Sequence, residues 1–225
     1  MDAYDVIVIG KGNAALCAAL AARDEGARVG MLEAAAEDES GGNSRFAGGV
    51  MRFAYGSVDD LRRVTEITDE EVAGSDFGTN TREEFLDDLY RLTSYRTDPD
   101  LSELLVNRSL DTMAWLRSKG VRFVLNYGRQ SGLVGGKRKF FGRMPIEVSG
   151  GGAGLVQHLD AAAKKSGIDV HYETRAVSLV HDGARVQGVR VKRRGKADEV
   201  HARAVVLACG GFEANPEWRT RYLGP

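Results

Sequence analysis

A strand, a glycine turn and a helix follow one another at the amino terminus, and their order restricts the fold more than any other part of the sequence. Residues 5–9 are a short, β-branched apolar run, which is typical of a strand buried in a parallel sheet. Residues 13–25 are rich in Ala and Leu and are followed by Gly26, a pattern that predicts a helix and its end. Residues 28–32 predict a second strand. The sequence therefore predicts a β-α-β unit and an α/β fold.

The turn between this strand and helix has the composition of a phosphate-binding loop. The run Gly10-Lys11-Gly12-Asn13-Ala14-Ala15 fits the pattern G-x-G-x-x-G/A, and Glu33 follows the second strand about twenty residues later. Gly10 permits the tight turn, Gly12 has no Cβ to hold a pyrophosphate away from the backbone, and the small Ala15 lets the helix pack near the strand. The helix amino terminus adds N–H groups and a positive dipole end. These features predict a dinucleotide site.

Two residues of this unit refine the prediction. Glu33 can accept hydrogen bonds from ribose hydroxyls and would repel a 2′-phosphate, so FAD or NAD suits the site better than NADP. Lys11 stands where a small residue is common, and its side chain can either point outward or contact a phosphate. A strand-turn-helix with coincidental glycines is the alternative to a nucleotide site.

The remaining chain predicts a helical insertion followed by more strands. Residues 34–56 form a long glycine-rich loop. Many acidic residues lie between residues 57 and 75, which suggests a solvated, mobile surface segment. Capping patterns at Thr81 and at Asp98-Pro99 predict two helices. We expect the second helix to turn five apolar side chains inward: Leu101, Leu104, Leu105, Met113 and Leu116. The sequence then predicts a helix at 154–165 and a strand at 168–172. Short strands at 176–180, 186–192 and 199–201 suggest an antiparallel meander, and residues 204–208 predict another buried strand.

Composition excludes several classes of function. The chain has 31 basic and 32 acidic residues, so no global charge favours nucleic acid. The basic and aromatic run at 137–143 fits a solvated loop or hairpin better than a nucleic-acid patch. The longest apolar run, residues 14–22, is far below the ~18 residues of a membrane span. Residues 1–4 lack a signal-peptide pattern, which favours a cytoplasmic protein. Cys17 and Cys209 are expected in the core, with no disulfide framework and no metal site.

Further segments occur in an order that resembles a known family. They are Gly41-Gly42-Asn43-Ser44 with Ala47-Gly48-Gly49, then Gly150-Gly151-Gly152, then residues 206–212, in which Cys209 replaces a usual Thr. This set resembles the FAD-dependent fumarate reductase and succinate dehydrogenase flavoprotein subunits. Residues 12–20 are most similar to the tricarballylate dehydrogenase branch of that family.

The resemblance implies a noncovalent FAD site formed by separate segments. Pyrophosphate would be held by Gly10, Gly12, Asn13, Ala14 and Ala15, and the adenosine ribose by Glu33. The loop containing Gly41, Gly42, Asn43, Ser44, Ala47, Gly48 and Gly49 would line the flavin side, Val177 would meet the adenine, and Ala208 and Gly210 would close the pocket near the adenosine. Some members attach FAD to a His beside this Ser, but Arg45 follows Ser44 and all four histidines lie at 158 or beyond.

The resemblance also implies a reaction and an incomplete active site. We expect a Rossmann-like FAD-binding domain over residues 1–225, with a parallel sheet, a β-meander and an inserted helical segment. Hydride would pass between flavin N5 and a dicarboxylate or tricarboxylate, with tricarballylate as the closest candidate substrate. The resemblance does not identify the electron acceptor. The family's catalytic His and Arg follow the Gly-Gly-Phe motif, and no residue of this chain matches them. We therefore expect the capping domain and last FAD segment beyond Pro225, and an inactive chain when isolated. The alternatives are a non-catalytic dinucleotide-binding fragment and a related flavoenzyme such as a ketosteroid dehydrogenase.

Overall fold

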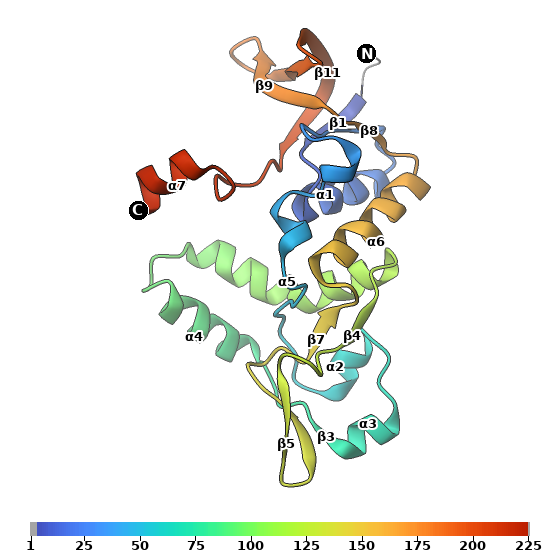
Figure 1. Ribbon diagram of the computed structural model, residues 1–225, viewed down its shortest axis with the longest axis vertical. Coiled ribbons are helices and arrows are strands. Elements are labelled where there is room, and N and C mark those ends of the chain that lie inside the picture. The colour runs from blue at the N-terminus through green and yellow to red at the C-terminus, as the bar shows by residue number, and fades with distance from the viewer. Residues whose placement is uncertain (1–3, 225) are drawn as a thin grey trace. The chain divides into compact units, whose positions relative to one another are not determined.

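The computed structural model describes residues 4–224 and divides the chain into two compact units (Figure 1). The first unit comprises Met1–Ala47 and Gly152–Pro225, and the second unit comprises Gly48–Gly151. The second unit is therefore inserted into the first. Residues 1–3, which enter the expectation about a targeting segment, lie outside the described residues. Within residues 4–224, no helix combines the length and apolar character that a bilayer span requires.

The predicted β-α-β unit opens the first unit. It consists of β1 (Tyr4–Ile9), α1 (Asn13–Asp24) and β2 (Val29–Leu32), and β1 pairs in parallel with β2. The sheet has the order β8-β2-β1-β11-β10-β9. Its other strands are β8 (Asp169–His171), β9 (Thr174–His181), β10 (Val186–Arg193) and β11 (Lys196–Leu207). The expected α/β fold with a parallel sheet and a meander is confirmed.

Strand β11 belongs to both parts of this sheet. Residues 196–201 pair antiparallel with β10, and residues 202–207 pair parallel with β1. The sequence predicted two strands, at 199–201 and 204–208, but one continuous strand of 12 residues covers both. Charged residues in its first half hide this continuity from an apolar pattern.

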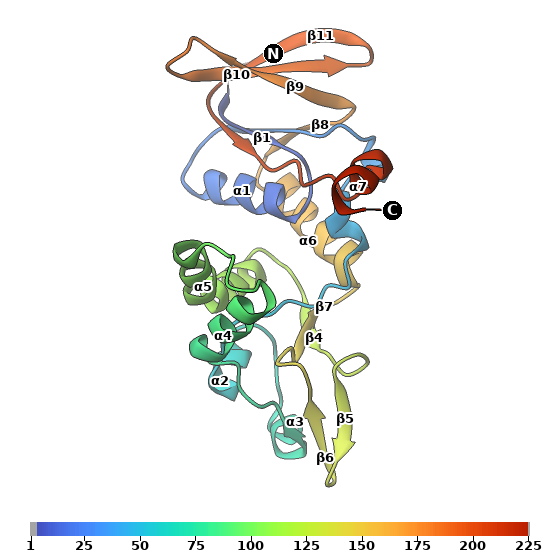
Figure 2. The same ribbon diagram turned by 90° about the vertical axis from the view of Figure 1, so that its left-hand side faces the viewer.

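The first unit is layered around the parallel strands. Ile7, Ile9 and Leu32 of the parallel strands share one buried cluster with Val189 and Val191 of β10. Figures 1 and 2 show β9, β10 and β11 beyond β1 and β8 on one side, and α1 and α6 (Gly151–Lys165) on the other. Ala15, Leu16, Ala19 and Leu20 of α1 are buried because one face of this helix packs against the sheet. The shorter elements of this unit are η1 (Glu37–Glu39), η2 (Gly42–Phe46) and α7 (Pro216–Leu223).

The second unit contains the inserted helices and short strands. Both capping patterns are confirmed: Thr81 caps α4 (Arg82–Leu92), and Asp98 caps α5 (Pro99–Ser118). The strands are β3 (Ser75–Asp76), β4 (Phe123–Leu125), β5 (Ser131–Val134), β6 (Lys137–Phe140) and β7 (Ile146–Val148). Strands β5 and β6 pair as a hairpin, so the basic run at 137–143 begins as a hairpin strand.

Two expectations for the second unit need correction. The acidic segment at 57–75 has many exposed residues, but it also contains α2 (Val58–Arg62) and α3 (Asp69–Gly74), each beginning at a capping box, and it buries Leu61 and Val64; its mobility stays a prediction. Apolar residues of α5 also divide differently than expected. Met113 and Leu116 are buried, but Leu101, Leu104 and Leu105 are more than half exposed.

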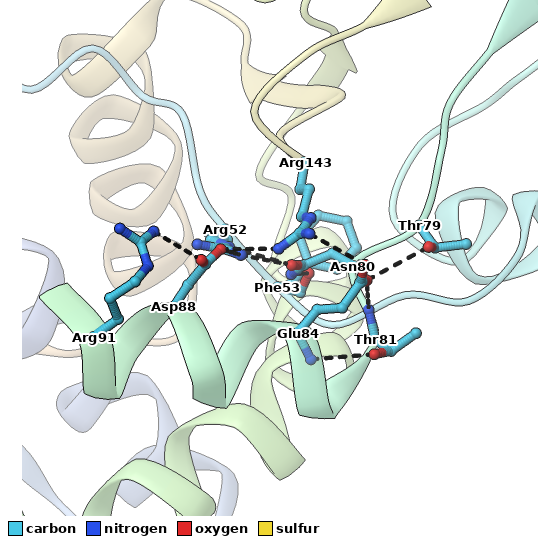
Figure 3. Close-up of polar contacts among 9 residues, drawn as sticks. All are labelled: Arg52, Phe53, Thr79, Asn80, Thr81, Glu84, Asp88, Arg91 and Arg143. Carbon is cyan, nitrogen blue, oxygen red and sulfur yellow. Dashed lines mark hydrogen bonds and ion pairs between the residues drawn. The ribbon is translucent and has the colours of Figure 1, made fainter. Parts of the chain in front are cut away.

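A polar network joins three segments of the second unit around Asp88 of α4. Arg52 and Arg143 donate to its Oδ2 at 2.6 and 2.9 Å, and Arg91 donates to Oδ1 at 3.0 Å (Figure 3). Arg52 also reaches Oδ1 of Asn80, a fully buried residue whose side-chain amide donates to the Phe53 carbonyl. Hydrogen bonds from Arg52 and Arg91 lower the pKa of Asp88 to about 2. The carboxylate therefore stays ionised at neutral pH and ties α4 to the loops that carry Arg52 and Arg143.

Candidate functional site

The first unit contains a groove of about 830 Å³ at the carboxyl ends of β1, β2 and β11. This volume lies within the range of small-molecule and cofactor sites, and ligands of open α/β sheets bind at this edge. The groove is lined by eleven of the residues expected to bind the cofactor: Gly10, Gly12, Asn13, Ala14, Glu33, Gly42, Asn43, Ser44, Val177, Ala208 and Gly210. Residues from five separate segments thus meet in one concave surface.

The amino terminus of α1 faces this groove, and its N-cap residue, Gly12, has no side chain to cap the helix. The first turn has no acidic residue, and Ser44 Oγ of η2 accepts a hydrogen bond from the Asn13 N–H. The first backbone bond of the helix runs from the Leu16 N–H to the Gly12 carbonyl, so the N–H groups of Ala14 and Ala15 precede the helical ladder. The side chains of Thr81 and Asp98, in contrast, cap α4 and α5. The amino terminus of α1 has the chemistry of an anion site.

Gly10 and Gly12 are glycines for different structural reasons. Gly10 has a φ of +109°, and a Cβ there would lie 2.4 Å from the Ala208 carbonyl oxygen, so the turn and the close approach of the chain after β11 both require glycine. Gly12 has an ordinary φ of −77°. Its Cβ would lie 3.2 Å from Ser44 Oγ, which accepts a hydrogen bond of 2.9 Å from the Asn13 N–H. The bare Gly12 therefore lets η2 close on the phosphate turn.

Glu33 lies just after β2 with part of its carboxylate already engaged. Its Oε1 accepts a hydrogen bond of 2.8 Å from the Ala35 N–H, and its backbone is fixed between the His171 carbonyl and the Thr174 N–H. The side chain is half-buried in the groove wall. Its orientation is thus set by local hydrogen bonds, and Oε2 is available to accept from a ribose hydroxyl.

A bulge in β9 places backbone polar groups at the groove wall. Ala176 pairs with Val191 and Ser178 pairs with Arg190, so Val177 is the additional residue on the β9 strand. Val177 lines the groove and is 65% exposed. A residue left out of strand pairing can offer its N–H and C=O to the edge of an adenine ring. This geometry supports the expected role of Val177.

Five expected residues do not line the groove. Ala15 is fully buried beside the sheet, Gly41 has a φ of +111° and packs against Val156, and the Ala47 carbonyl accepts a hydrogen bond from the Gly152 N–H. Gly48 and Gly49 belong to the second unit. Ala15 packs α1 on the sheet, and Gly41 and Ala47 contact α6, while the flavin contacts of Gly48 and Gly49 stay predictions.

The structure corrects the expectation for the cysteines. Cys209 is exposed and lines the groove, whereas a core position was expected. Cys17 is half-buried in α1, donates to Asn13 Oδ1, and burial raises the pKa of its thiol to about 11. The apolar run before Cys209 belongs to β11, but Cys209 itself follows the strand end, which a run of apolar letters does not reveal.

Sequence reasoning also missed Asp160 and left Lys11 unplaced. Lys11 is only 3% exposed, and its Nζ lies 2.6 Å from Oδ1 of Asp160 on α6. The two residues are far apart in the sequence, so no local pattern could have paired them. The presence of a lysine where small residues are common was the available signal.

These observations fit FAD. The chemistry of the α1 amino terminus suits a pyrophosphate, that of Glu33 suits a ribose, and the bulge at Val177 suits an adenine. Noncovalent attachment of FAD stays a prediction.

Comparisons with known proteins agree with this geometry. A fumarate reductase (cytochrome) of Shewanella frigidimarina is 32% identical over 226 residues, covering 100% of this chain and 36% of that protein. The open conformation of a flavocytochrome c3 fumarate reductase superposes with a TM-score of 0.73 at 29% identity, covering 98% of this chain and 36% of that one. A 3-ketosteroid-Δ4-(5α)-dehydrogenase from Rhodococcus jostii RHA1 has the same TM-score at 23% identity over 98% of this chain and 48% of its own, and shows a shared fold.

The chain spans about a third of the length of its fumarate reductase relative. Residues 5–225 match the model of a family described as "FAD binding domain". The family match shows FAD as the cofactor of this domain. This chain belongs to the FAD binding domain family.

Proposed function

We propose that this chain forms the FAD-binding part of a flavin-dependent reductase or dehydrogenase that acts on a dicarboxylate or tricarboxylate, with tricarballylate as the candidate substrate. The main observation behind this proposal is the groove in which the amino terminus of α1, the glycine turn and Glu33 converge. The relatives named as fumarate reductases support the carboxylate class, because fumarate is a dicarboxylate. Tricarballylate rests on the similarity of residues 12–20 to that branch.

The chain's own residues would bind and orient the cofactor. The N–H groups at the amino terminus of α1, that of Ala14 among them, would donate to pyrophosphate oxygens, and Glu33 would fix the adenosine ribose. Asn43 and Ser44 of η2 would line the groove toward the flavin. Bound FAD would supply hydride transfer between flavin N5 and a substrate carbon. The role of this chain is thus to hold the flavin ring of FAD in place and to stabilise the negative charge of the FAD phosphates.

The test begins with the purified protein. We expect a flavin absorbance spectrum, and release of free FAD into the supernatant after acid precipitation because the attachment is noncovalent. Turnover is measured on a longer protein that contains this chain, because no residue of this chain matches the family's catalytic His and Arg. There, reduced viologen dye should be oxidised in the presence of fumarate, or an electron-accepting dye reduced in the presence of tricarballylate. A protein with no flavin absorbance after reconstitution would refute the proposal.

A ketosteroid substrate is the competing outcome. The relationship to the Rhodococcus jostii enzyme is one of fold, so it does not favour a steroid. The same dye assay with 4-androstene-3,17-dione separates the two classes. Turnover of the steroid without turnover of either carboxylate would replace the carboxylate proposal and leave the FAD site unchanged.

A further inference from the structure

The phosphate turn contains an enclosed ion pair that the FAD site does not explain. Lys11 lies between the two glycines of the turn, and its Nζ is 2.6 Å from Oδ1 of Asp160. The ammonium group also lies 5.5 Å from the centre of the Tyr172 ring, within the range of a cation–π contact. Lys11 is 3% exposed. A cation so enclosed is costly unless its partners are well placed, so the pair needs a structural reason.

A direct contact between Lys11 and phosphate is the first explanation to weigh. Lys11 is among the residues that line the groove, but its Nζ is held by Asp160 and lies over the ring of Tyr172, so the ammonium group would have to leave both to reach a phosphate. Burial raises the pKa of Asp160, but hydrogen bonds from Lys11 and Lys164 outweigh burial and hold the pKa below its usual value. Asp160 therefore stays ionised at neutral pH, and moving Lys11 would deprive a half-buried carboxylate of one of its two cations. The geometry disfavours that movement.

Helix α6 contacts three of the segments around the groove. Asp160 holds the phosphate turn through Lys11, and Lys164 bridges Asp160 at 3.0 Å to Glu37 of η1 at 2.9 Å. The first turn of α6 packs on the flavin-side loop, where Gly152 N–H donates to the Ala47 carbonyl at 2.8 Å. The helix thus sets the relative positions of these segments, and Lys11 is the turn's polar link to it.

We propose that Lys11 is a positioning residue for FAD: its ion pair with Asp160 fixes the phosphate turn on α6, while backbone N–H groups bind the pyrophosphate. The inference rests on the FAD site of the proposed function. An anchored turn presents its N–H groups without ordering them when FAD binds, and such preorganisation increases affinity. Losing the anchor should weaken FAD binding even though Lys11 never touches the cofactor.

The experiment measures FAD affinity in purified apo-protein by quenching of flavin fluorescence, at two salt concentrations and at a temperature where each variant is folded. The variants are Lys11→Met, Asp160→Asn and the double variant, with Lys165→Met as control because Lys165 is an exposed lysine on the same helix. Lys11→Gln, which keeps a hydrogen-bond donor, replaces Lys11→Met if the latter does not fold. Each single change should raise Kd about tenfold or more. The double variant should raise Kd by less than the product of the single effects, and the control should not change it.

The salt dependence distinguishes positioning from phosphate contact. A positioning role leaves the salt dependence of Kd in Lys11→Met equal to that of the wild type. A weaker salt dependence in Lys11→Met, or tighter binding in Asp160→Asn, would overturn the inference in favour of a direct phosphate contact. Kd values within twofold of wild type for both single variants would also overturn it. Failure of the wild-type protein to bind FAD would refute the proposed function and this inference with it.

Discussion

Replacing Gly152 with Ala tests how closely α6 and the flavin-side loop are packed. A Cβ at this position would lie 2.1 Å from the Ser44 carbonyl oxygen, and 2.6 and 2.8 Å from the carbonyl oxygen and nitrogen of Ala47. All three atoms are backbone, so no side-chain rotation relieves the clash. The loop must move away from the helix for the methyl group to fit.

Gly152→Ala should lower the free energy of unfolding, whereas a Gly→Ala change in a helix usually raises it. Gly→Ala inside a helix ordinarily stabilises a protein by ~0.5–1 kcal/mol. Here overpacking costs ~1–3 kcal/mol, and weakening the hydrogen bond between the Gly152 N–H and the Ala47 carbonyl adds ~0.5–1.5 kcal/mol. The balance is a destabilisation of about 2 kcal/mol, which corresponds to a fall in Tm of roughly 4–8 °C for a chain of this length.

The assay is thermal unfolding of the apo-protein together with its FAD occupancy after reconstitution. Ala153→Ser is the matched control, because this neighbouring residue is exposed and an added oxygen there should change stability by less than about 0.5 kcal/mol. FAD occupancy should fall in Gly152→Ala, since the displaced loop includes Ser44. A Tm for Gly152→Ala at or above that of the wild type would refute the packing argument.

Two further perturbations address the turn and the polar network. Gly12→Val should abolish FAD retention while the protein stays folded by circular dichroism, because its side chain would meet Ser44 and fill the space by the helix end; unchanged flavin occupancy would contradict this. Asp88→Asn should lower the urea midpoint at pH 7. Because the pKa of Asp88 is lowered to about 2, below ~3.9 for an unfolded chain, its contribution is complete above pH ~4 and is lost as the pH falls toward 2. The difference between wild type and Asp88→Asn should therefore shrink over that range, and a difference independent of pH would count against the assignment.

Local signals predicted the β-α-β unit and the helix starts because these features depend on neighbours in sequence. The caps at Thr81 and Asp98 need only the first helical turn, and both are present. The buried face of α5 depends instead on a distant partner. Ser109 Oγ accepts a hydrogen bond of 2.9 Å from the Ala54 N–H, so the face with the small serines packs inward and the face with Leu104 stays exposed. Apolar spacing along the helix could not reveal that bond.

The groove was predictable only in part for the same reason. The phosphate turn and Glu33 follow from one stretch of sequence, whereas the role of Val177 was implied by family resemblance alone. The bulge that exposes Val177 results from the register between β9 and β10, and the position of Lys11 results from a contact with α6. Such positions depend on pairings between distant segments, which a single sequence does not encode in any short pattern.

Strand β11 pairs with both β10 and β1, and this affects how the chain folds. Residues 4–9 find their partners at residues 202–207, so the sheet of the first unit stays incomplete until those residues have been synthesised. At ~5–20 residues per second, β1 waits roughly 10–40 s for that partner. During this interval β1 exposes an unpaired edge that favours aggregation, while the contiguous segment 48–151 can fold without waiting for β11. Yields of native protein should therefore depend on the rate of synthesis and on chaperones that cover the first strand.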